Sequence, residues 1–123
     1  MEFCNKEVGA AGEEIAAEYL TRHGWEILFR NYRCKLGEID MIARKKNLLC
    51  FIEVKCRRGE RYGRPCEAVT KDKRRHIRRV AQYCIVRDDY RLGIDDDTDF
   101  RFDVIEVLGA DGDSDICVIQ NAF

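Results

Sequence analysis

Proline is almost absent from this sequence: Pro65 is the single one among 123 residues. The chain also has no internal repeat and no low-complexity tract, so nothing marks a linker between two folding units. A chain of this length is normally one domain that buries about two-thirds of the surface exposed by its unfolded form. We therefore expect a single domain over residues 1–123.

Long apolar runs are lacking as well. The first residues have no apolar core of signal-peptide length. No later stretch approaches the roughly 18 apolar residues that a membrane span requires. We expect a soluble, cytoplasmic protein without a membrane partner.

A C-x-x-C pair is missing, although the chain has seven cysteines. An odd set without that pair argues against a secreted disulfide framework and against a zinc knuckle. The simplest interpretation is reduced thiols that serve as small core residues. A nucleophilic Cys–His pair with His23 or His76 is an alternative, but neither histidine lies in a known nucleophile motif.

A net charge of one sign is also lacking, because the formal charge is only −1. The charges are nevertheless segregated: residues 1–54 carry −1, residues 55–91 carry +8 and residues 92–123 carry −8. The basic middle segment favours an anionic partner. A solvated helix face balanced by an acidic tail is the alternative interpretation.

The hydrophobic pattern predicts helices and strands in a mixed order. Helical periodicity predicts helices over residues 9–22 and about 71–88, with Thr70 as the N-cap of the second. Strand-like patterns occur in the segments WEILFRNY, GEIDMIA, LLCFIEVKCR, RFDVIEVL and DICVI. The order is α-β-β-β-α-β plus a C-terminal strand, which predicts an α/β fold with a mixed central sheet flanked by helices.

Charged side chains interrupt the apolar strands at four positions. Because side chains alternate along a strand, Glu38 and Asp40 share one face of GEID, while Glu53 and Lys55 share one face of FIEVK. Charges in such a place are costly unless they are paired or bind a metal. The pattern therefore indicates either a Glu53–Lys55 ion pair or a functional site.

The hairpin register decides whether the carboxylates meet. With RKKN as the turn, we expect Ala43 opposite Leu48, which pairs Asp40 with Phe51 and makes Glu53 its diagonal neighbour. The two carboxylates then suit one Mg²⁺ ion, which needs one or two carboxylates besides water and substrate phosphate. A register shifted by one residue would turn Asp40 to the other face and exclude the site.

Such a site has the chemistry of metal-assisted phosphodiester hydrolysis. A bound metal lowers the pKa of water and neutralises charge on a phosphate, and an adjacent Lys55 can stabilise or orient the attacking hydroxide. The carbonyl oxygen of Val54, between Glu53 and Lys55, is a further oxygen ligand within reach.

A series of motifs extends this interpretation from about Gly9 to Val107. GxxGEExAAxYLxxxGWxIL, RNYR, GEIDMIA, FIEVKCR, YGxPxEAVxxDKRR and RFDVIEV follow in order. Together they resemble the bacterial YraN family, which is similar to archaeal Holliday-junction resolvases and belongs with the PD-(D/E)XK nucleases. The resemblance implies a restriction-endonuclease-like core.

The resemblance also implies roles for single residues. Asp40 and Glu53 would ligate Mg²⁺ or Mn²⁺, Lys55 would be the catalytic lysine, and Glu13 on the first helix would be an additional catalytic acid that binds metal or water. The proline that usually precedes the motif aspartate is Ile39 here, so the assignment of Asp40 depends on the family spacing.

The basic middle segment then has a specific use, because phosphate contacts position a duplex without reading its sequence. We expect such contacts from the arginines and the lysine that would flank the site: Arg57, Arg58, Arg61, Arg64, Lys73, Arg74, Arg75 and Arg78. The resulting hypothesis is a Mg²⁺-dependent endonuclease that acts on structured or branched DNA.

Two alternatives stay open at this stage. One is a non-catalytic nucleic-acid-binding module with a nuclease-like fold in a DNA repair or uptake assembly. The other is a regulatory module that uses the acidic tail as a protein interface. Resolvase-like relatives pair two sites to cut two strands, so a homodimer is a further expectation from the resemblance.

Overall fold

The computed structural model describes residues 6–57, 70–108 and 115–122, with side chains described from Ala11 and without that of Arg57. All the elements predicted from the sequence are present, together with one short additional helix. In chain order they are α1 (Lys6–Arg22), β1 (Glu26–Cys34), β2 (Gly37–Lys45), β3 (Leu48–Arg57), α2 (Lys71–Arg87), α3 (Asp89–Leu92), β4 (Asp99–Leu108) and β5 (Asp115–Ile119).

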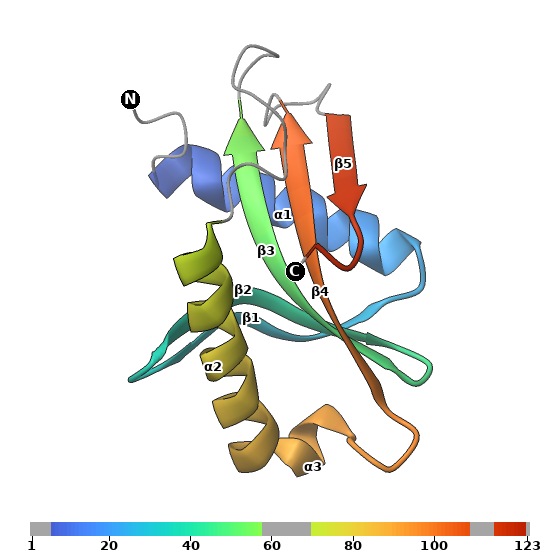
Figure 1. The fold of residues 1–123 in the computed structure, drawn as a ribbon. Helices are drawn as coiled ribbons and strands as arrows, with labels where there is room; N and C mark the ends of the chain where they lie inside the picture. Colours follow the sequence, from blue (N-terminus) through green and yellow to red (C-terminus); the bar gives the residue numbers. More distant parts are fainter. Residues whose placement is uncertain (1–5, 58–69, 109–114, 123) are drawn as a thin grey trace.

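The described strands form one sheet in the order β1-β2-β3-β4-β5. Only β3 and β4 pair in parallel, whereas the other neighbours are antiparallel. A parallel pair needs a long crossover, and α2 lies in the segment that joins these two strands (Figure 1). The predicted mixed α/β fold is therefore confirmed.

The two long helices cover opposite faces of the sheet (Figure 1). On β3, Cys50 and Ile52 pack in the cluster that contains the apolar residues of α1, while Leu49 and Phe51 pack in the cluster of α2. Alternation along β3 therefore places Glu53 and Lys55 on the α2 face. No helix in the described ranges is both long and apolar enough to cross a bilayer.

The register of the β2–β3 hairpin differs from the prediction. Ala43 lies opposite Cys50, not Leu48, and Phe51 lies opposite Ile42, not Asp40. The reason is the turn: β2 extends to Lys45, inside the RKKN segment, so only two residues separate the end of β2 from the start of β3. A shift of two residues preserves the faces, so Asp40 stays on the face that carries Glu53.

The N-terminus of α2 is capped as predicted. The backbone N–H of Lys73 donates to the hydroxyl oxygen of Thr70 at 3.2 Å, which satisfies one of the amides that a helix start leaves unpaired. Ile77, Val80 and Cys84 form the buried side of the helix. This packing fixes the rotation of α2 and directs its first turn toward the end of β3 that carries Glu53.

Candidate active site

Asp40 lies where β2 and β3 separate. The paired residues end with Met41 opposite Ile52, and the next residues of the two strands are Asp40 and Glu53. There the backbone N–H of Val54 donates to Oδ2 of Asp40 at 2.8 Å. A carboxylate thus accepts from an amide of β3 just beyond the last pair of the ladder.

The surroundings raise the pKa of Asp40 from 3.8 to about 7. Burial is the main cause, and the charges of Glu53 and Glu13 act in the same direction. The hydrogen bond from Val54 and the charge of Lys73 lower the pKa but do not cancel these effects. A half-buried carboxyl with other acids around it has the electrostatics of a cation site.

Glu53 is held by two lysines. Its side chain is 9% exposed, and its Oε2 lies 2.6 Å from Nζ of Lys73 and 3.6 Å from Nζ of Lys55. Lys73 is therefore the closer partner, although the sequence motif pairs Glu53 with Lys55. Burial lowers the pKa of Lys73, but its hydrogen bond to Glu53 and the nearby carboxylates raise it above the ordinary lysine value.

The pKa of Lys55 shifts in the opposite direction from that of Lys73. Its pKa is lowered, first by burial and then by the contact with the Lys73 ammonium. The carboxylates of Glu53 and Asp40 act against this effect without reversing it. Lys55 consequently loses its proton more easily than an ordinary lysine does.

Glu13 is the outermost of the expected acids. It is half-buried on α1, and its charge contributes to the raised pKa of Asp40. Among the described residues, however, no three His, Cys, Asp or Glu side chains form a group that could hold a metal ion. The structure thus brings together Asp40, Glu53 and Lys55, with Glu13 acting on Asp40 through its charge.

The two carboxylates nevertheless suit a hard cation. They offer oxygen ligands on one face of the sheet, and Mg²⁺ or Mn²⁺ requires only one or two protein carboxylates. Burial raises the pKa of Asp40 most, and the negative charges of Glu53 and Glu13 add to this effect; a divalent cation would relieve that charge repulsion. The donor chemistry therefore fits the metal that the sequence leads us to expect.

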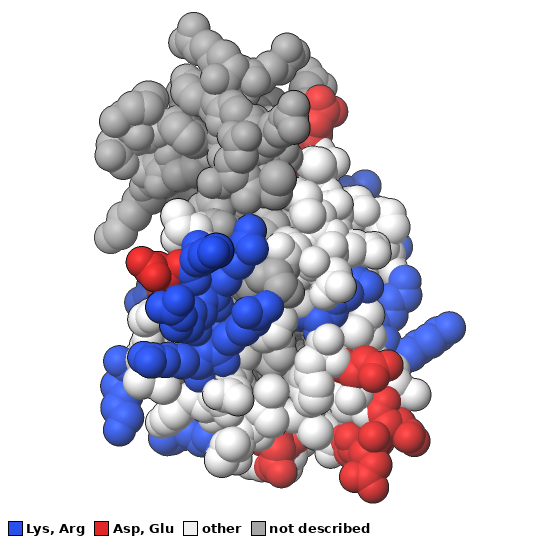
Figure 2. Space-filling view, in the orientation of Figure 1, with Lys and Arg blue, Asp and Glu red and all other residues white. Residues whose placement is uncertain are grey.

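Basic side chains gather over α2 beside this cluster, as Figure 2 shows. Arg75 and Arg78 are exposed, whereas Arg74 is partly buried. Arg75 contacts Asp72 at 3.4 Å, and Arg78 lies over the ring of Phe102 with 5.9 Å to the ring centre. Four expected phosphate contacts lie outside the described side chains: Arg57, Arg58, Arg61 and Arg64.

Glu38 shares the strand of Asp40 but not its surroundings. It is exposed and pairs with Arg33, with 2.9 Å between Nε and Oε1. Of the two acidic side chains of β2, Glu38 thus belongs to a surface ion pair, whereas Asp40 is a half-buried residue of the site.

The family comparison agrees with the motif series. Residues 12–107 match the model of "Uncharacterised protein family UPF0102". The chain belongs to the UPF0102 family. A UPF0102 protein of Clostridium botulinum (strain Loch Maree / Type A3) is 47% identical over 125 residues, which cover 100% of this chain and 98% of the relative. A UPF0102 protein of Caldicellulosiruptor saccharolyticus is 46% identical over 120 residues, covering 96% and 98%.

The position of Lys73 in this UPF0102 protein differs from the prediction. The sequence predicted Lys73 to be one of the phosphate contacts, but in the structure its ammonium group contacts the carboxylate of Glu53. The available signal was the predicted N-cap Thr70, which lies three residues before Lys73 and places this lysine in the first turn of α2. An N-cap does not determine how the helix is oriented against the sheet, so it could not predict that Glu53 is the partner of Lys73.

Proposed function

We propose that this UPF0102 protein is a Mg²⁺- or Mn²⁺-dependent endonuclease that hydrolyses phosphodiester bonds in structured or branched DNA. The observation that carries the proposal is the pair formed by the half-buried Asp40 and the buried Glu53, with two lysines at Glu53, where β2 and β3 separate. Perturbed acids and bases that converge on one face are typical of catalytic sites. The motif series supports the choice of phosphodiester chemistry.

In this proposal Asp40 and Glu53 hold the metal ion, and Glu13 supports it from α1. The bound ion would supply an acidified water and neutralise charge on the phosphate. Lys55, whose pKa is lowered, accepts the proton of the attacking water when neutral. When protonated, it donates a hydrogen bond to a non-bridging phosphate oxygen.

The basic face of α2 would hold the nucleic acid beside this cluster. Arg75 and Arg78 are exposed there, and guanidinium groups bind phosphates without reading base sequence. The two features together, an acidic cluster flanked by a basic helix, suit cleavage of a polyanion better than cleavage of a neutral substrate.

A non-catalytic DNA-binding module, within a repair or uptake assembly, is the second candidate. The observation that favours it is the ion pair between Lys73 and Glu53, in which the ammonium lies 2.6 Å from Oε2, one of the oxygens that a metal ion would need. An acid paired in this way stabilises the fold without a metal. The same basic face would then serve binding alone.

The deciding experiment incubates the purified protein with branched, duplex and single-stranded DNA in the presence of Mg²⁺ or Mn²⁺. Asp40→Asn and Lys55→Met should abolish cleavage, and Glu38→Gln is the matched control from the same strand as Asp40. Cleavage that persists in both site variants would refute the assigned roles. Binding without cleavage of any substrate would favour the second candidate.

The DNA-binding face is tested separately by salt dependence. Each neutralised phosphate contributes about −0.9 to the slope of log affinity against log salt for duplex DNA. Arg75→Glu and Arg78→Glu should weaken binding and flatten this slope, whereas Arg87→Glu, at the far end of α2, should have a smaller effect. An unchanged slope in the first two variants would exclude α2 as the phosphate-binding element.

A further inference from the structure

A cavity lies on the opposite face of the sheet from the carboxylates. It has a volume of about 320 Å³ and is lined by the C-terminal part of α1, by Trp25 just before β1, and by strands β2 to β5. Ile52 of β3 lines it and packs in the cluster of α1, whereas the next residue, Glu53, lies on the α2 face. The cavity and the candidate active site thus lie on opposite faces of the sheet.

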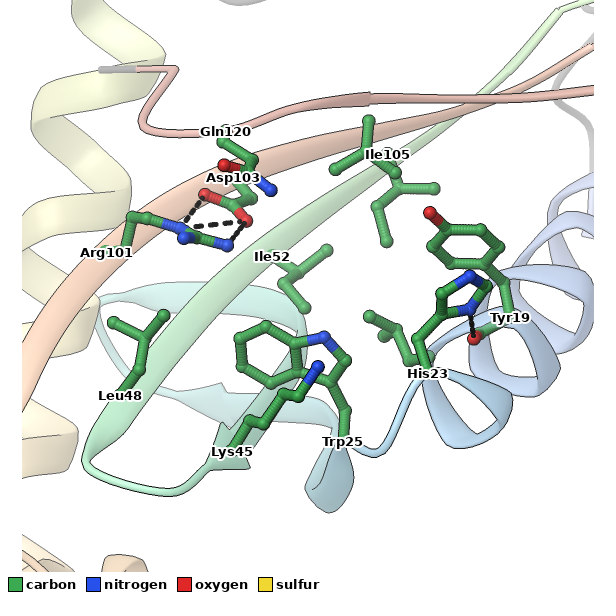
Figure 3. A pocket seen from close by; sticks show the side chains of 12 residues that line it. Tyr19, His23, Trp25, Lys45, Leu48, Ile52, Arg101, Asp103, Ile105 and Gln120 are labelled. Carbon is green, nitrogen blue, oxygen red and sulfur yellow. Dashed lines mark hydrogen bonds and ion pairs between the residues drawn. The ribbon is translucent and has the colours of Figure 1, made fainter.

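Aromatic rings form two walls of this cavity, and aliphatic side chains form its base (Figure 3). The rings of Tyr19 and His23 lie against each other with 4.1 Å between their centres, and Trp25 lies across from them. Ile52 and Ile105 are almost completely buried beneath. An apolar base between aromatic walls suits a flat ring.

Two cations lie at the Trp25 side. Nζ of Lys45 is 5.9 Å and Cζ of Arg101 is 5.8 Å from the centre of the indole ring. Lys45 comes from the end of β2 and is exposed, so it can turn toward a ligand at little cost. Two positive groups beside one indole ring favour an anion at this side of the cavity.

Arg101 is fixed in place by a buried acid. Its Nε and Nη2 donate to the carboxylate of Asp103 at 2.8–3.2 Å, and Asp103 also accepts the backbone N–H of Asn121 at 2.9 Å. The side chain of Asp103 is 4% exposed. This bidentate pair holds the guanidinium rigidly, and the side chain of Cys50 is a further hydrogen-bond partner of Arg101. The bonds to Asp103 use Nε and Nη2, which leaves Nη1 as the nitrogen that can approach a second anionic group.

We propose that this cavity binds a small anion that carries a planar aromatic ring, of which a nucleoside monophosphate is the representative. The ring lies between Trp25 and the Tyr19–His23 wall, and the anionic group pairs with Lys45 and Arg101. This inference does not depend on the nuclease activity, because it involves none of the residues assigned to that site.

The molecule carries its own reporter, since Trp25 is the only tryptophan. Titration with adenosine monophosphate should quench the tryptophan fluorescence saturably, and calorimetry should give the same Kd. Adenosine lacks the anion and inorganic phosphate lacks the ring, so both should bind at least about tenfold more weakly. A short oligonucleotide with a terminal phosphate tests whether the natural ligand is a free nucleotide or the end of a strand. Whichever of adenosine monophosphate and this oligonucleotide has the lower Kd identifies the source of the ligand.

Lys45→Gln is the decisive variant, and its neighbour Lys46→Gln is the matched control, because Lys46 is exposed and does not line the cavity. Lys45→Gln should raise the Kd for adenosine monophosphate about tenfold through loss of a charge-assisted contact, while Lys46→Gln leaves it within about twofold. Absence of saturable binding to the unmodified protein would overturn the inference. An equal effect of both variants, or equal affinity for adenosine and its monophosphate, would overturn it too.

Discussion

Replacement of Asp40 by asparagine should make the protein more stable while it removes the proposed activity. Asparagine has the same shape and still accepts the Val54 N–H with its side-chain oxygen. The wild-type carboxyl has a pKa of about 7 in the folded protein against an ordinary 3.8. At 1.36 kcal/mol per pH unit, its ionisation lowers the free energy of unfolding by about 4 kcal/mol above pH 7.

The sign and the pH window follow from this raised pKa. The contribution of Asp40 to stability is fully present below about pH 4, where the folded and unfolded states are both protonated. It is lost as the pH rises through about 7. Asp40→Asn should therefore gain up to about 4 kcal/mol at about pH 8 and only about 1 kcal/mol at about pH 4.5.

Urea unfolding followed by circular dichroism at several pH values measures this difference directly. Glu38→Gln is the control, since it removes a carboxylate from the same strand but from an exposed ion pair worth at most about 1 kcal/mol. If Asp40→Asn proved less stable than the wild type at about pH 8, the ionised Asp40 carboxylate would not destabilise the folded protein, and the argument from its raised pKa would be refuted. A gain of equal size at every pH would refute the argument as well.

Three further predictions concern the cation, the second lysine and the first helix. Mn²⁺ at about a hundred times its Kd should stabilise the wild type by about 2.7 kcal/mol in thermal unfolding but Asp40→Asn by less than about 1 kcal/mol; equal shifts would contradict a metal site there. Lys73→Met should cost about 1–2 kcal/mol near neutral pH in urea unfolding, because it leaves a buried carboxylate without its closest partner. The exposed Lys71→Met should cost clearly less, and equal losses would argue against the ion pair. Gly12→Ala should destabilise by about 1–3 kcal/mol, because its new methyl group would overlap the sulfur of Cys56; Cys56→Ala should restore part of this loss, and a failure to do so would place the clash elsewhere.

Local patterns in the sequence were sufficient for the helices, the strands and the faces. The alternation that places Glu53 on one face is a property of a single strand, and it holds whatever the neighbouring strand does. For the same reason the two-residue error in the hairpin register did no harm to the site. Asp40 kept its face and came to follow the last β2–β3 pair directly, next to Glu53.

Contacts between distant elements were beyond the same reasoning. Lys73 reaches Glu53 only because Ile77 and Val80 seat α2 on the sheet at one particular rotation. The cavity beside Trp25 likewise combines residues from α1 and from strands β2 to β5. Neither arrangement has a period or a spacing along the chain, so no pattern in the sequence could have indicated it.

The hydrogen bond from Val54 to Asp40 makes one backbone amide an internal indicator of the site's charge state. An amide proton bonded to a carboxylate resonates at a different NMR frequency when that carboxylate takes up a proton or a cation. The Val54 resonance should therefore titrate with the pKa of Asp40, near 7. Loading of the site can thus be followed in solution whether or not any DNA strand is cut.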